Sequence, residues 1–463
     1  MPFDSASMDL EKAMGRVTEQ HHQHGGAVSH AFTLQCVTGG LERSHCKRLI
    51  QFLRKHAIVE LSLFRTDVGT HPEATTMFCR YLASAPLHTL RLRSVMLNAA
   101  QTRQVLNALA EHGRLEEFVY DGAALNQATD ALVGFLEHNT VLRKLDLSCE
   151  MWALGSTEPL ARGLMASRNT NLHHLSLNGC QLEDADAAHL LEWLGGNECH
   201  PTLSTLELRY NQLRERSLAS LAKLLIQMPT PVNKDSNRLG QSQQSQEGRR
   251  AVIPPRSTNL HLLDLSRNVT LFAGDVTENI DLFCQALGDN TNLKSLYVRH
   301  CGVSAYALEQ IAAAVVRNTT LKVLDVRQLG LPAQARFPVA FMDRMAEWQG
   351  VETLELDFKF TAADADAFVQ ALRRNTSLLS GSLEGLPTSV RADVEYTFRR
   401  NRWWKRARDL LADNHPALYA SHGGVWMHAL ARMKQQTDAG DTAVFCTLRE
   451  RLSLWLESKE MRS

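Results

Sequence analysis

The sequence lacks the features of a membrane protein, of a Sec-secreted protein and of a disulfide-linked or zinc-binding domain. It has no run of about 18 apolar residues, and its first thirty residues lack the apolar core of a signal peptide. The nine cysteines are odd in number and form no C-x-x-C pair, so neither a disulfide framework nor a zinc site is expected. These absences favour a reducing compartment and predict a cytoplasmic location.

Neither sign of charge is in excess, because 50 Lys and Arg are balanced by 50 Asp and Glu. The balance argues against a partner chosen by bulk charge, such as nucleic acid held through many phosphates. Catalytic signatures are also missing: the chain has no G-x-S-x-G, no P-loop, no H-E-x-x-H and no nucleotide-binding glycine fingerprint. We therefore predict a non-enzymatic chain with no cofactor, no metal site and no evident small-molecule substrate.

What the sequence does contain is a repeated phrase. "RNTTLKVLDVRQLGL" (Arg317 to Leu331) has the form L-x-x-L-x-L followed by a turn, and closely similar phrases begin at Arg168, Asp289 and His138. Looser copies begin at Ile58, Leu87, Leu115, Leu203, Leu260 and Val351, with degenerate ones at Ala31 and Leu378. The starts are mostly 27 to 33 residues apart, and a fixed period in that range indicates a repeat array.

Each repeat has two halves with different apolar periods. In "LHTLRLRSVML" (Leu87 to Leu97) apolar residues alternate as in a short strand that enters a turn. In "DADAAHLLEWLGGN" (Asp184 to Asn197) helical spacing relates Ala187, Leu190, Leu191 and Leu194. One strand–helix unit cannot bury its apolar faces alone, so we expect the units to stack around a shared core.

The repeats resemble the leucine-rich repeat, L-x-x-L-x-L-x-x-(N/C)-x-L, with the turn residue present as Asn211, Asn268, Cys180 and Cys301. A period near 28 with a full helix, and Asn-Thr before several strands, resembles the ribonuclease-inhibitor-like subclass. The resemblance covers about residues 31–386. It implies an α/β solenoid (horseshoe) with parallel strands on the concave face and helices on the convex face, and such arrays mostly hold protein partners.

The spacing of the copies predicts three regions. Residues 1–28, which include the His-rich stretch "HHQHGG", are interpreted as a mobile polar tail. Residues 29–386 form the repeat array, with a mobile insertion at 229–259 where no L-x-x-L-x-L occurs. The insertion is either a tolerated expansion or a segment that orders on a partner. Residues 387–463 are expected to form a C-terminal helical cap or small helical domain.

The consensus phrase also predicts individual roles. Leu321, Leu324 and Val326 should point into the core, and Leu331 should close the turn. The pair Asn318-Thr319 should end the preceding helix and satisfy backbone groups where the chain reverses. Three asparagines also stand in N-x-(S/T) form, and without a secretory signal we interpret them as turn residues rather than glycosylation sites: Asn268, Asn318 and Asn375.

Residues that alternate with the buried leucines are expected on the concave face, stacked into columns about 5 Å apart. The column between the last two core positions is mostly acidic: Asp146, Ser176, Glu207, Asp264, Tyr297, Asp325 and Glu355. Two interpretations stay open, a self-satisfied ladder of surface pairs of little energy and a protein-binding face rich in Tyr and Arg. For the second, the candidate partner-binding residues are Glu207, Arg209, Tyr210, Asp264, Arg267, Tyr297, Arg299, His300, Asp325 and Arg327.

A second candidate is the basic segment "FRRNRWWKRAR" (Phe398 to Arg408), which contains no acid. Its tryptophans could pack a cap onto the last repeat while the bases stay solvated. The segment could instead lie on an anionic membrane or bind single-stranded nucleic acid. Its candidate residues are Arg399, Arg400, Arg402, Trp403, Trp404, Lys405 and Arg406.

Some bacterial leucine-rich repeat effectors carry ubiquitin ligase domains, and this chain departs from them. Cys446 stands in "FCTLRE", which lacks the C-x-D setting of the ligase nucleophile, so we expect a small core residue. No stretch before Ile58 matches an F-box. The prediction is therefore a protein-binding scaffold. The alternative is an effector that enters a host cell by a non-Sec route and binds or adapts a host target there, with a link to ubiquitin machinery left open.

Overall fold

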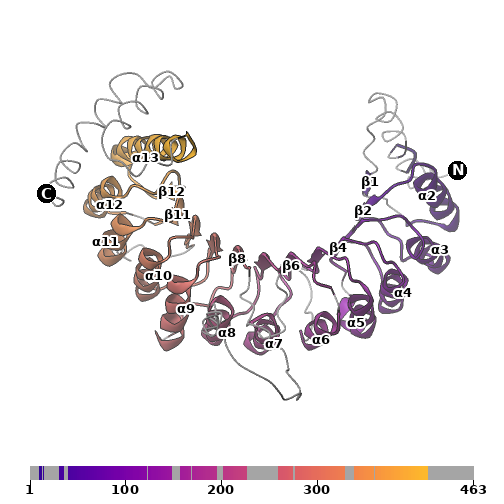
Figure 1. Ribbon diagram of the computed structural model, residues 1–463. Coiled ribbons are helices and arrows are strands. Elements are labelled where there is room, and N and C mark those ends of the chain that lie inside the picture. The colour runs from indigo at the N-terminus through magenta and orange to yellow at the C-terminus, as the bar shows by residue number, and fades with distance from the viewer. Residues whose placement is uncertain are drawn as a thin grey trace, which may run out of the picture. The chain divides into compact units, whose positions relative to one another are not determined.

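The computed structural model describes residues 10–12, 14, 31–35, 40–122, 124–148, 157–167, 169–195, 202–226, 259–274, 277–328, 338–358 and 360–414. The chain divides into two compact units, Met1–Ala314 and Val315–Ser463, here called the N-terminal unit and the C-terminal unit. Strands and helices alternate in both (Figure 1). The strand–helix repeat predicted from the sequence is confirmed.

The described strands of the N-terminal unit pair in parallel, each with its neighbour in sequence. They are β1 (Ala31–Gln35), β2 (Glu60–Phe64), β3 (Thr89–Arg93), β4 (Glu117–Tyr120), β5 (Lys144–Asp146), β6 (His174–Ser176), β7 (Thr205–Glu207), β8 (Leu262–Asp264) and β9 (Ser295–Tyr297). Each strand falls within a predicted apolar phrase, including the degenerate copy at Ala31. The strands are short because apolar alternation lasts only a few residues before the turn.

Helices return the chain from the end of each strand to the start of the next. They are α2 (Arg43–Lys55), α3 (Pro72–Leu82), α4 (Ala99–Ala110), the short η1 (Leu125–Gln127), α5 (Thr129–His138), α6 (Glu158–Ala166), α7 (Asp184–Gly195), α8 (Glu215–Leu225), α9 (Thr277–Asp289) and α10 (Ala305–Arg317). Within the N-terminal unit the strands line the inner side of the curve and the helices its outer side (Figure 1). The inner strand face is therefore the concave surface that the sequence predicts.

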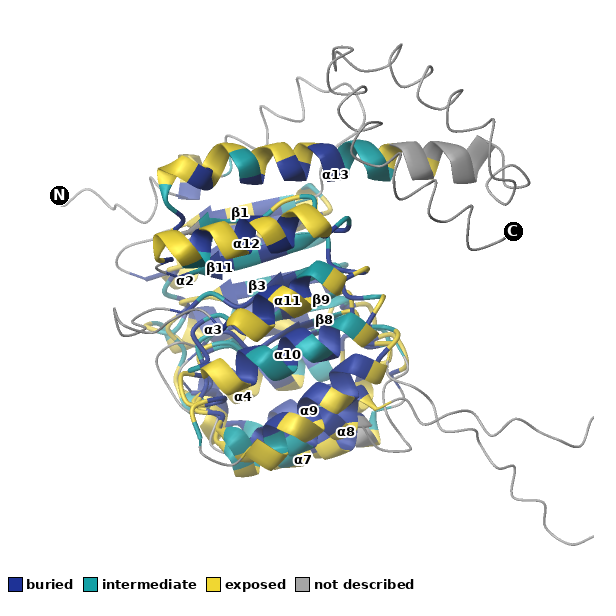
Figure 2. Cartoon of the chain, turned by 90° about the vertical axis from the view of Figure 1, so that its left-hand side faces the viewer, coloured by how far each residue is buried: buried dark blue, intermediate teal, exposed yellow. Residues whose placement is uncertain are grey.

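The C-terminal unit continues the pattern and then ends it. It contains β10 (Val323–Asp325), α11 (Val339–Glu347), β11 (Thr353–Asp357), α12 (Ala362–Arg374), β12 (Leu383–Glu384) and α13 (Thr388–Asn414). The 27-residue α13 packs on α12 (Figure 2). A long helix thus covers the last repeat of the C-terminal unit, and residues 415–463 of the expected cap lie outside the described residues.

The core consists of the consensus leucines and one face of each helix. Leu321, Leu324 and Val326 are fully buried, as predicted, and Leu331 lies outside the described residues. The four residues of α7 that share helical spacing, Ala187, Leu190, Leu191 and Leu194, are buried to 1% exposure or less. Burial of a leucine contributes about 1.5–3 kcal/mol, so a period of several such residues accounts for stacking without disulfides or metals.

The long spacing between Leu203 and Leu260 adds no repeat. β7 pairs directly with β8, with Glu207 and Asp264 as register partners, and α8 packs on α9. The 57-residue spacing therefore holds a connection between adjacent repeats, as the missing L-x-x-L-x-L predicts. The residues of the predicted mobile insertion lie outside the described part, apart from Asn259.

Part of the predicted N-terminal tail differs from the expectation. Residues 10–12 and 14 are helical, and Leu10 is fully buried. Glu11 forms an ion pair of 2.6 Å with Arg48 of α2. The contact involves only one apolar residue and one carboxylate. The polar composition of residues 1–28 therefore does not predict it.

One asparagine at the end of several helices joins consecutive repeats. Asn139 follows α5, and its side-chain Oδ1 accepts hydrogen bonds from the backbone N of Val141 (3.0 Å) and Leu142 (2.7 Å). Its Nδ2 donates to the carbonyl of Leu115 in the preceding repeat at 3.1 Å. Asn169, Asn290 and Asn375 make the same kinds of contact, and the buried Asn318 accepts from the backbone N of Thr320 and Leu321.

A second set of buried polar side chains occupies the consensus turn position after the strand. Asn211 Nδ2 donates to the carbonyl of Leu177 at 2.9 Å, and Asn268 Nδ2 donates to that of Leu208 at 3.0 Å. Cys301 fills the same place through its thiol, which donates to the carbonyl of Leu265 at 3.0 Å. The three N-x-(S/T) asparagines are at most 1% exposed, so their assignment to turns is confirmed.

We expect Asn139→Ala to lower the free energy of unfolding by about 3 kcal/mol, because it leaves a carbonyl and two N–H groups without partners inside the protein. The matched change Asn107→Ala, at an exposed position of α4, should cost less than about 0.5 kcal/mol. Urea unfolding followed by circular dichroism compares the two. Equal midpoints for both variants would contradict the role assigned to Asn139.

Candidate functional site

The strand register places the predicted columns on the inner face. Ser176 pairs with Asp146 and with Glu207, and Asp264 pairs with Glu207 and with Tyr297. These are the residues that alternate with the buried leucines, in the predicted order. In the C-terminal unit Asp325 pairs with Glu355 in the same way. The alignment of the acidic column is therefore confirmed within each unit.

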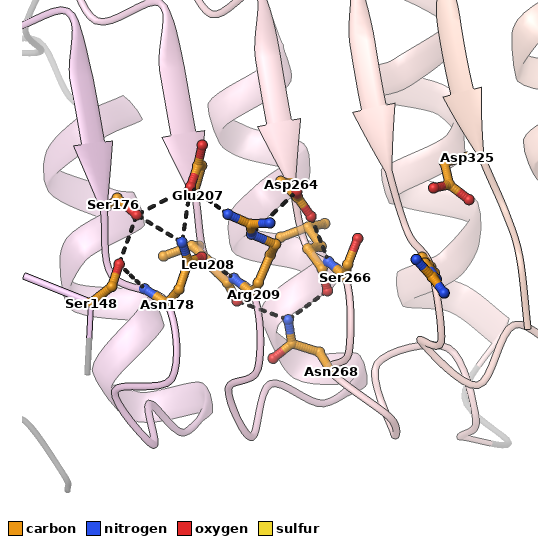
Figure 3. A network of polar contacts seen from close by, with 12 residues as sticks. Ser148, Ser176, Asn178, Glu207, Leu208, Arg209, Asp264, Ser266, Asn268 and Asp325 are labelled. Carbon is orange, nitrogen blue, oxygen red and sulfur yellow. Dashed lines mark hydrogen bonds and ion pairs between the residues drawn. The ribbon is translucent and has the colours of Figure 1, made fainter. Parts of the chain in front are cut away.

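Arg209 lies between two carboxylates of neighbouring repeats (Figure 3). Its Nη2 donates to Glu207 Oε2 at 3.0 Å, and its Nε lies 3.5 Å from Asp264 Oδ2. Asp264 also accepts a hydrogen bond from the backbone N of Ser266 at 2.9 Å. The guanidinium of Arg209 thus forms ion pairs with two acidic residues of the column.

Serine and amide side chains extend this network toward β5. Asn178 Nδ2 donates to Glu207 Oε2 at 2.9 Å, and the hydroxyl of Ser176 donates to the same oxygen at 3.2 Å. The hydroxyls of Ser148 and Ser176 are 2.8 Å apart. The floor of the inner face from β5 to β8 is consequently a ladder of hydrogen bonds that an ion pair extends from Arg209 to Asp264 (Figure 3).

The pKa values of the two carboxyl groups of this ladder, Glu207 and Asp264, are shifted in opposite directions. Burial disfavours the charge of Glu207, but the hydrogen bond from Asn178 and the charge of Arg209 outweigh it and lower the pKa below its ordinary value. Burial dominates at Asp264 and raises its pKa, and the nearby charge of Glu207 acts in the same direction. The charged form is therefore favoured at Glu207 and disfavoured at Asp264.

Arginines also pair across the repeats nearer the N-terminus. Arg91 donates two hydrogen bonds to the carboxylate of Glu117, at 3.0 and 2.8 Å. Arg93 Nη2 donates to Asp146 Oδ2 at 2.9 Å, across the repeat in which the buried Val119 offers no polar group. Asp121 accepts from the backbone N of Ser94, and burial raises its pKa.

A groove of about 1110 Å³ runs along the inner face at the turn end of strands β2 to β7. Phe64, Met96 and Leu97 line one end, and Arg209 and Tyr210 line the other. The side chains of Met96 and Tyr210 are 71% and 51% exposed. Glu207, Arg209 and Tyr210 belong to the predicted site, whereas the end at Phe64 and Met96, which Arg93 also lines, was not predicted. Phe64 and Arg93 are register partners, so the column pattern, followed back to β2, could have found it.

The turn position after β7, β8 and β9 carries large side chains in an unusual backbone conformation. Tyr210, Arg267 and His300 have φ values of 56°, 66° and 55°, and Gly179 has 70° at the equivalent position of the preceding repeat. The backbone N of Tyr210 donates to the carbonyl of Ser266 at 2.9 Å. This bond to the next repeat fixes the left-handed conformation, which a glycine adopts without steric cost.

The other predicted residues divide between the units. Tyr297 and Arg299 are half-buried on β9 and just after it, and Arg299 Nε donates to His300 Nε2 at 3.0 Å. In the C-terminal unit Arg327 donates to both oxygens of Asp325, at 3.0 and 2.6 Å. Asp325 is 2% exposed, so its carboxylate is occupied by Arg327.

The basic segment on α13 uses three of its cations within the C-terminal unit. Arg400 is 8% exposed and donates to the carbonyls of Arg373 and Asn375 at the end of α12. Arg402 donates to the carbonyl of Leu379 at 2.7 Å, and Lys405 donates to Glu352 at 2.5 Å. Burial opposes the charge of Glu352, but Lys405 outweighs it and lowers the pKa. The expectation that the bases of this segment stay solvated is therefore wrong for these three residues, because each is bonded to the repeats it covers.

Arg399 and Arg406 of this segment are exposed, and Trp403 and Trp404 are half-buried with their rings 5.4 Å apart. No helix among the described residues is long and apolar enough to cross a membrane. The described side chains likewise include no group of three or more His, Cys, Asp or Glu placed to hold a metal ion. Cys446 lies outside the described residues.

Isosteric amides at the two ladder carboxyls should have opposite effects on stability. Glu207→Gln should lower the free energy of unfolding at pH 7 by about 1–2 kcal/mol, since a charged acceptor of several hydrogen bonds is lost. Asp264→Asn should raise it, because the amide removes a disfavoured charge and its oxygen can still accept from Ser266.

The pKa shifts of the two carboxyl groups also give their contributions to stability opposite signs at neutral pH. The lowered pKa of Glu207 contributes stability above pH 4.5 that is lost as the pH falls through the lowered value. The raised pKa of Asp264 costs stability above that raised value, and the cost disappears as the pH falls toward 3.8. Urea unfolding at pH 7 and pH 3 checks both variants, and effects of equal sign at pH 7 would contradict these assignments.

We expect Arg400→Met to destabilise the C-terminal unit by about 2 kcal/mol, because two helix-terminal carbonyls lose a charged donor while the packing volume is kept. The neighbouring change Arg399→Met, at an exposed position, should stay within about 0.5 kcal/mol. Guanidinium unfolding followed by tryptophan fluorescence distinguishes the two. Similar losses for both variants would show that α13 is not anchored through Arg400.

Comparisons with known proteins bear on the repeat and the fold. Residues 168–190 match the family described as Leucine Rich repeat, and no curated protein matches the chain. One similar solved structure is Leiomodin-1 Actin-Binding Site 2, with 17% identity over 33% of this chain and 88% of that chain, at a TM-score of 0.28. Another is the tropomodulin C-terminal domain from Caenorhabditis elegans, with 15% identity over 33% of this chain and 89% of that chain, at a TM-score of 0.28.

The family match falls on the copy that contains β6 and most of α7. Parallel strands in sequence order, one helix after nearly every strand, and buried consensus leucines and asparagines recur from residue 31 to the start of α13. The chain therefore has the α/β fold of a leucine-rich repeat solenoid.

Proposed function

We propose that this chain is a non-enzymatic scaffold that binds a protein partner on the inner strand face. Within the leucine-rich repeats we assign it to the ribonuclease-inhibitor-like subclass, on the repeat period and the full helix that follows most strands. The proposed partner-binding residues are the members of the predicted set in the N-terminal unit that are exposed or half-buried, extended by the groove-lining Phe64, Arg93 and Met96. Those members are Glu207, Arg209, Tyr210, Arg267, Tyr297 and Arg299.

The observation that carries the proposal is the groove with exposed side chains at its two ends. Met96 projects with 71% of its surface exposed, and Tyr210 with 51%, and both line the groove. Tyrosine and methionine are enriched at protein interfaces. The groove spans six strands, about 24 Å at the usual strand spacing, which suits a segment of a partner protein better than a small ligand enclosed on all sides.

The ladder on the groove floor supports the proposal in a different way. Arg209 forms a hydrogen-bonded ion pair with Glu207 and a looser ion pair with Asp264, and such pairs contribute little binding energy by themselves. Their hydrogen bonds fix the side chains before a partner arrives, and a preorganised surface loses less entropy on binding. We therefore propose that the projecting side chains, Met96 and Tyr210, supply the affinity for the partner. The ladder on the floor determines how the partner is oriented.

Site-specific photo-crosslinking tests the proposed surface. A benzophenone amino acid in place of Tyr210 should crosslink one protein of defined mass from the source lysate, because the side chain projects into the groove. The same amino acid in place of Leu282, which is 44% exposed on the outer helix α9, should not capture that protein. Capture from Leu282 alone, or equally from both positions, would contradict binding at the inner face.

The alternative function, an effector that acts in a host cell, rests on the polar N-terminal residues as an export signal. An export assay separates it from the scaffold proposal. Since Leu10 and Glu11 contact folded residues, the informative deletion removes residues 1–9 and leaves that contact intact. Export that depends on these residues supports the effector role, and unchanged localisation argues against it.

A further inference from the structure

Two guanidinium groups near β8 and β9 differ from Arg91, Arg93 and Arg209 of the inner face and resemble Arg65, whose guanidinium lies 5.2 Å from the centre of the Phe64 ring. Arg91, Arg93 and Arg209 each form an ion pair with a carboxylate. Arg267 and Arg299 pair with no carboxylate among the described residues. The guanidinium of Arg267 lies 4.9 Å from the centre of the Tyr210 ring, and Arg299 donates to His300. Two half-buried cations therefore stand at the turn end of adjacent repeats without local neutralisation.

The acids of the neighbouring inner-face column are already engaged. Asp264 accepts from Ser266 and faces Arg209, and Glu207 receives Arg209, Asn178 and Ser176. The ladder of the floor thus satisfies its own charges. We call Tyr210, Arg267 and Arg299 the cationic stripe. No residue of the ladder compensates the positive charges of its two arginines.

Two members of the stripe, Tyr210 and Arg267, adopt a left-handed backbone that a side chain does not favour, whereas Arg299 does not. A non-glycine residue in the left-handed region costs of order 1 kcal/mol, and three consecutive repeats accept this conformation with Tyr210, Arg267 and His300. Glycine occupies the equivalent position at Gly179, so the turn itself needs no side chain. Strain that the fold could avoid is a feature of functional surfaces.

We propose that the cationic stripe binds a carboxylate-bearing segment of the protein partner. Guanidinium groups bind carboxylates in a planar, two-bond geometry, and Tyr210 keeps Arg267 in place through the cation–π contact. Adjacent repeats are about 5 Å apart, and side chains at i and i+2 of an extended segment are about 7 Å apart. Two acidic side chains of one extended segment can therefore reach Arg267 and Arg299 together. This inference rests on the proposed scaffold function and names the chemistry of its partner.

An acidic protein segment fits better than nucleic acid. The stripe offers two uncompensated cations, whereas a nucleic acid strand needs many phosphate contacts for affinity. The neighbouring column contains Asp146, Glu207 and Asp264, and the adjacent Arg93 and Arg209 are already paired with these carboxylates, so the column offers no uncompensated cation to a continuous phosphate backbone. A short acidic segment can engage the stripe without crossing that column.

Fluorescence anisotropy with labelled octapeptides tests the stripe in the full-length protein at low salt. The probes are an alternating Glu-Gly peptide, its Gln-Gly counterpart and an eight-nucleotide deoxythymidine strand. The Glu-Gly peptide should bind about tenfold more tightly than the Gln-Gly peptide, and the double change Arg267→Glu, Arg299→Glu should weaken it about tenfold or more. The matched change Arg162→Glu, Arg216→Glu, at exposed positions of α6 and α8, alters net charge equally and should retain binding within about twofold.

Three outcomes would overturn the proposal. They are equal binding of the Glu-Gly and Gln-Gly peptides, an equal loss in both double variants, and tighter binding of the nucleotide strand that is lost in the Arg267, Arg299 variant. Circular dichroism and thermal melting confirm that each variant is folded. If the peptide test fails while crosslinking from Tyr210 still captures a protein, the inner face binds a partner of other chemistry. If both fail, the scaffold proposal fails with it.

Discussion

The side-chain amide of one asparagine at the end of a helix is the interaction on which the repeats depend. In Asn139 the oxygen accepts hydrogen bonds from two N–H groups in the turn before the next strand, while the nitrogen donates to a carbonyl of the preceding repeat. A single planar group thereby fixes both the turn and the spacing between repeats. An asparagine side chain also joins α13 to the last repeat, because Asn401 within this helix donates to the carbonyl of Leu378.

Fixed spacing determines what the inner face can do. Parallel strands in register place equivalent residues of successive repeats about 5 Å apart, so charges on one column interact whether or not a partner is present. The structure resolves this by pairing: Arg209 serves Glu207 and Asp264, and Arg93 reaches Asp146 past an apolar residue. Pairing makes the floor rigid and leaves the chemistry of recognition to residues that project beyond it.

The turn after each strand supplies those projecting residues at a cost. Its backbone N–H must reach the next repeat, and this geometry requires a positive φ at Tyr210 and Arg267. Large side chains at such positions point away from the core and cannot add to its packing. The turn therefore separates two requirements, since the backbone satisfies the fold while the side chain stays available to a partner.

The sequence by itself determined the number and order of the repeats, the consensus core residues, the Asn turns and the alignment of the inner-face columns, because these follow from local periods of two and 3.6 residues. Only the tertiary structure decided which column residues remain exposed. Asp264, Asp325 and His300 are buried. Arg400 anchors α13, although the basic segment around it predicts a solvated surface. The apolar end of the groove at Phe64 and Met96 and the contact of Leu10 were likewise decided there. Exposure depends on neighbours from other repeats, often about 30 residues away in sequence, which a local pattern does not encode.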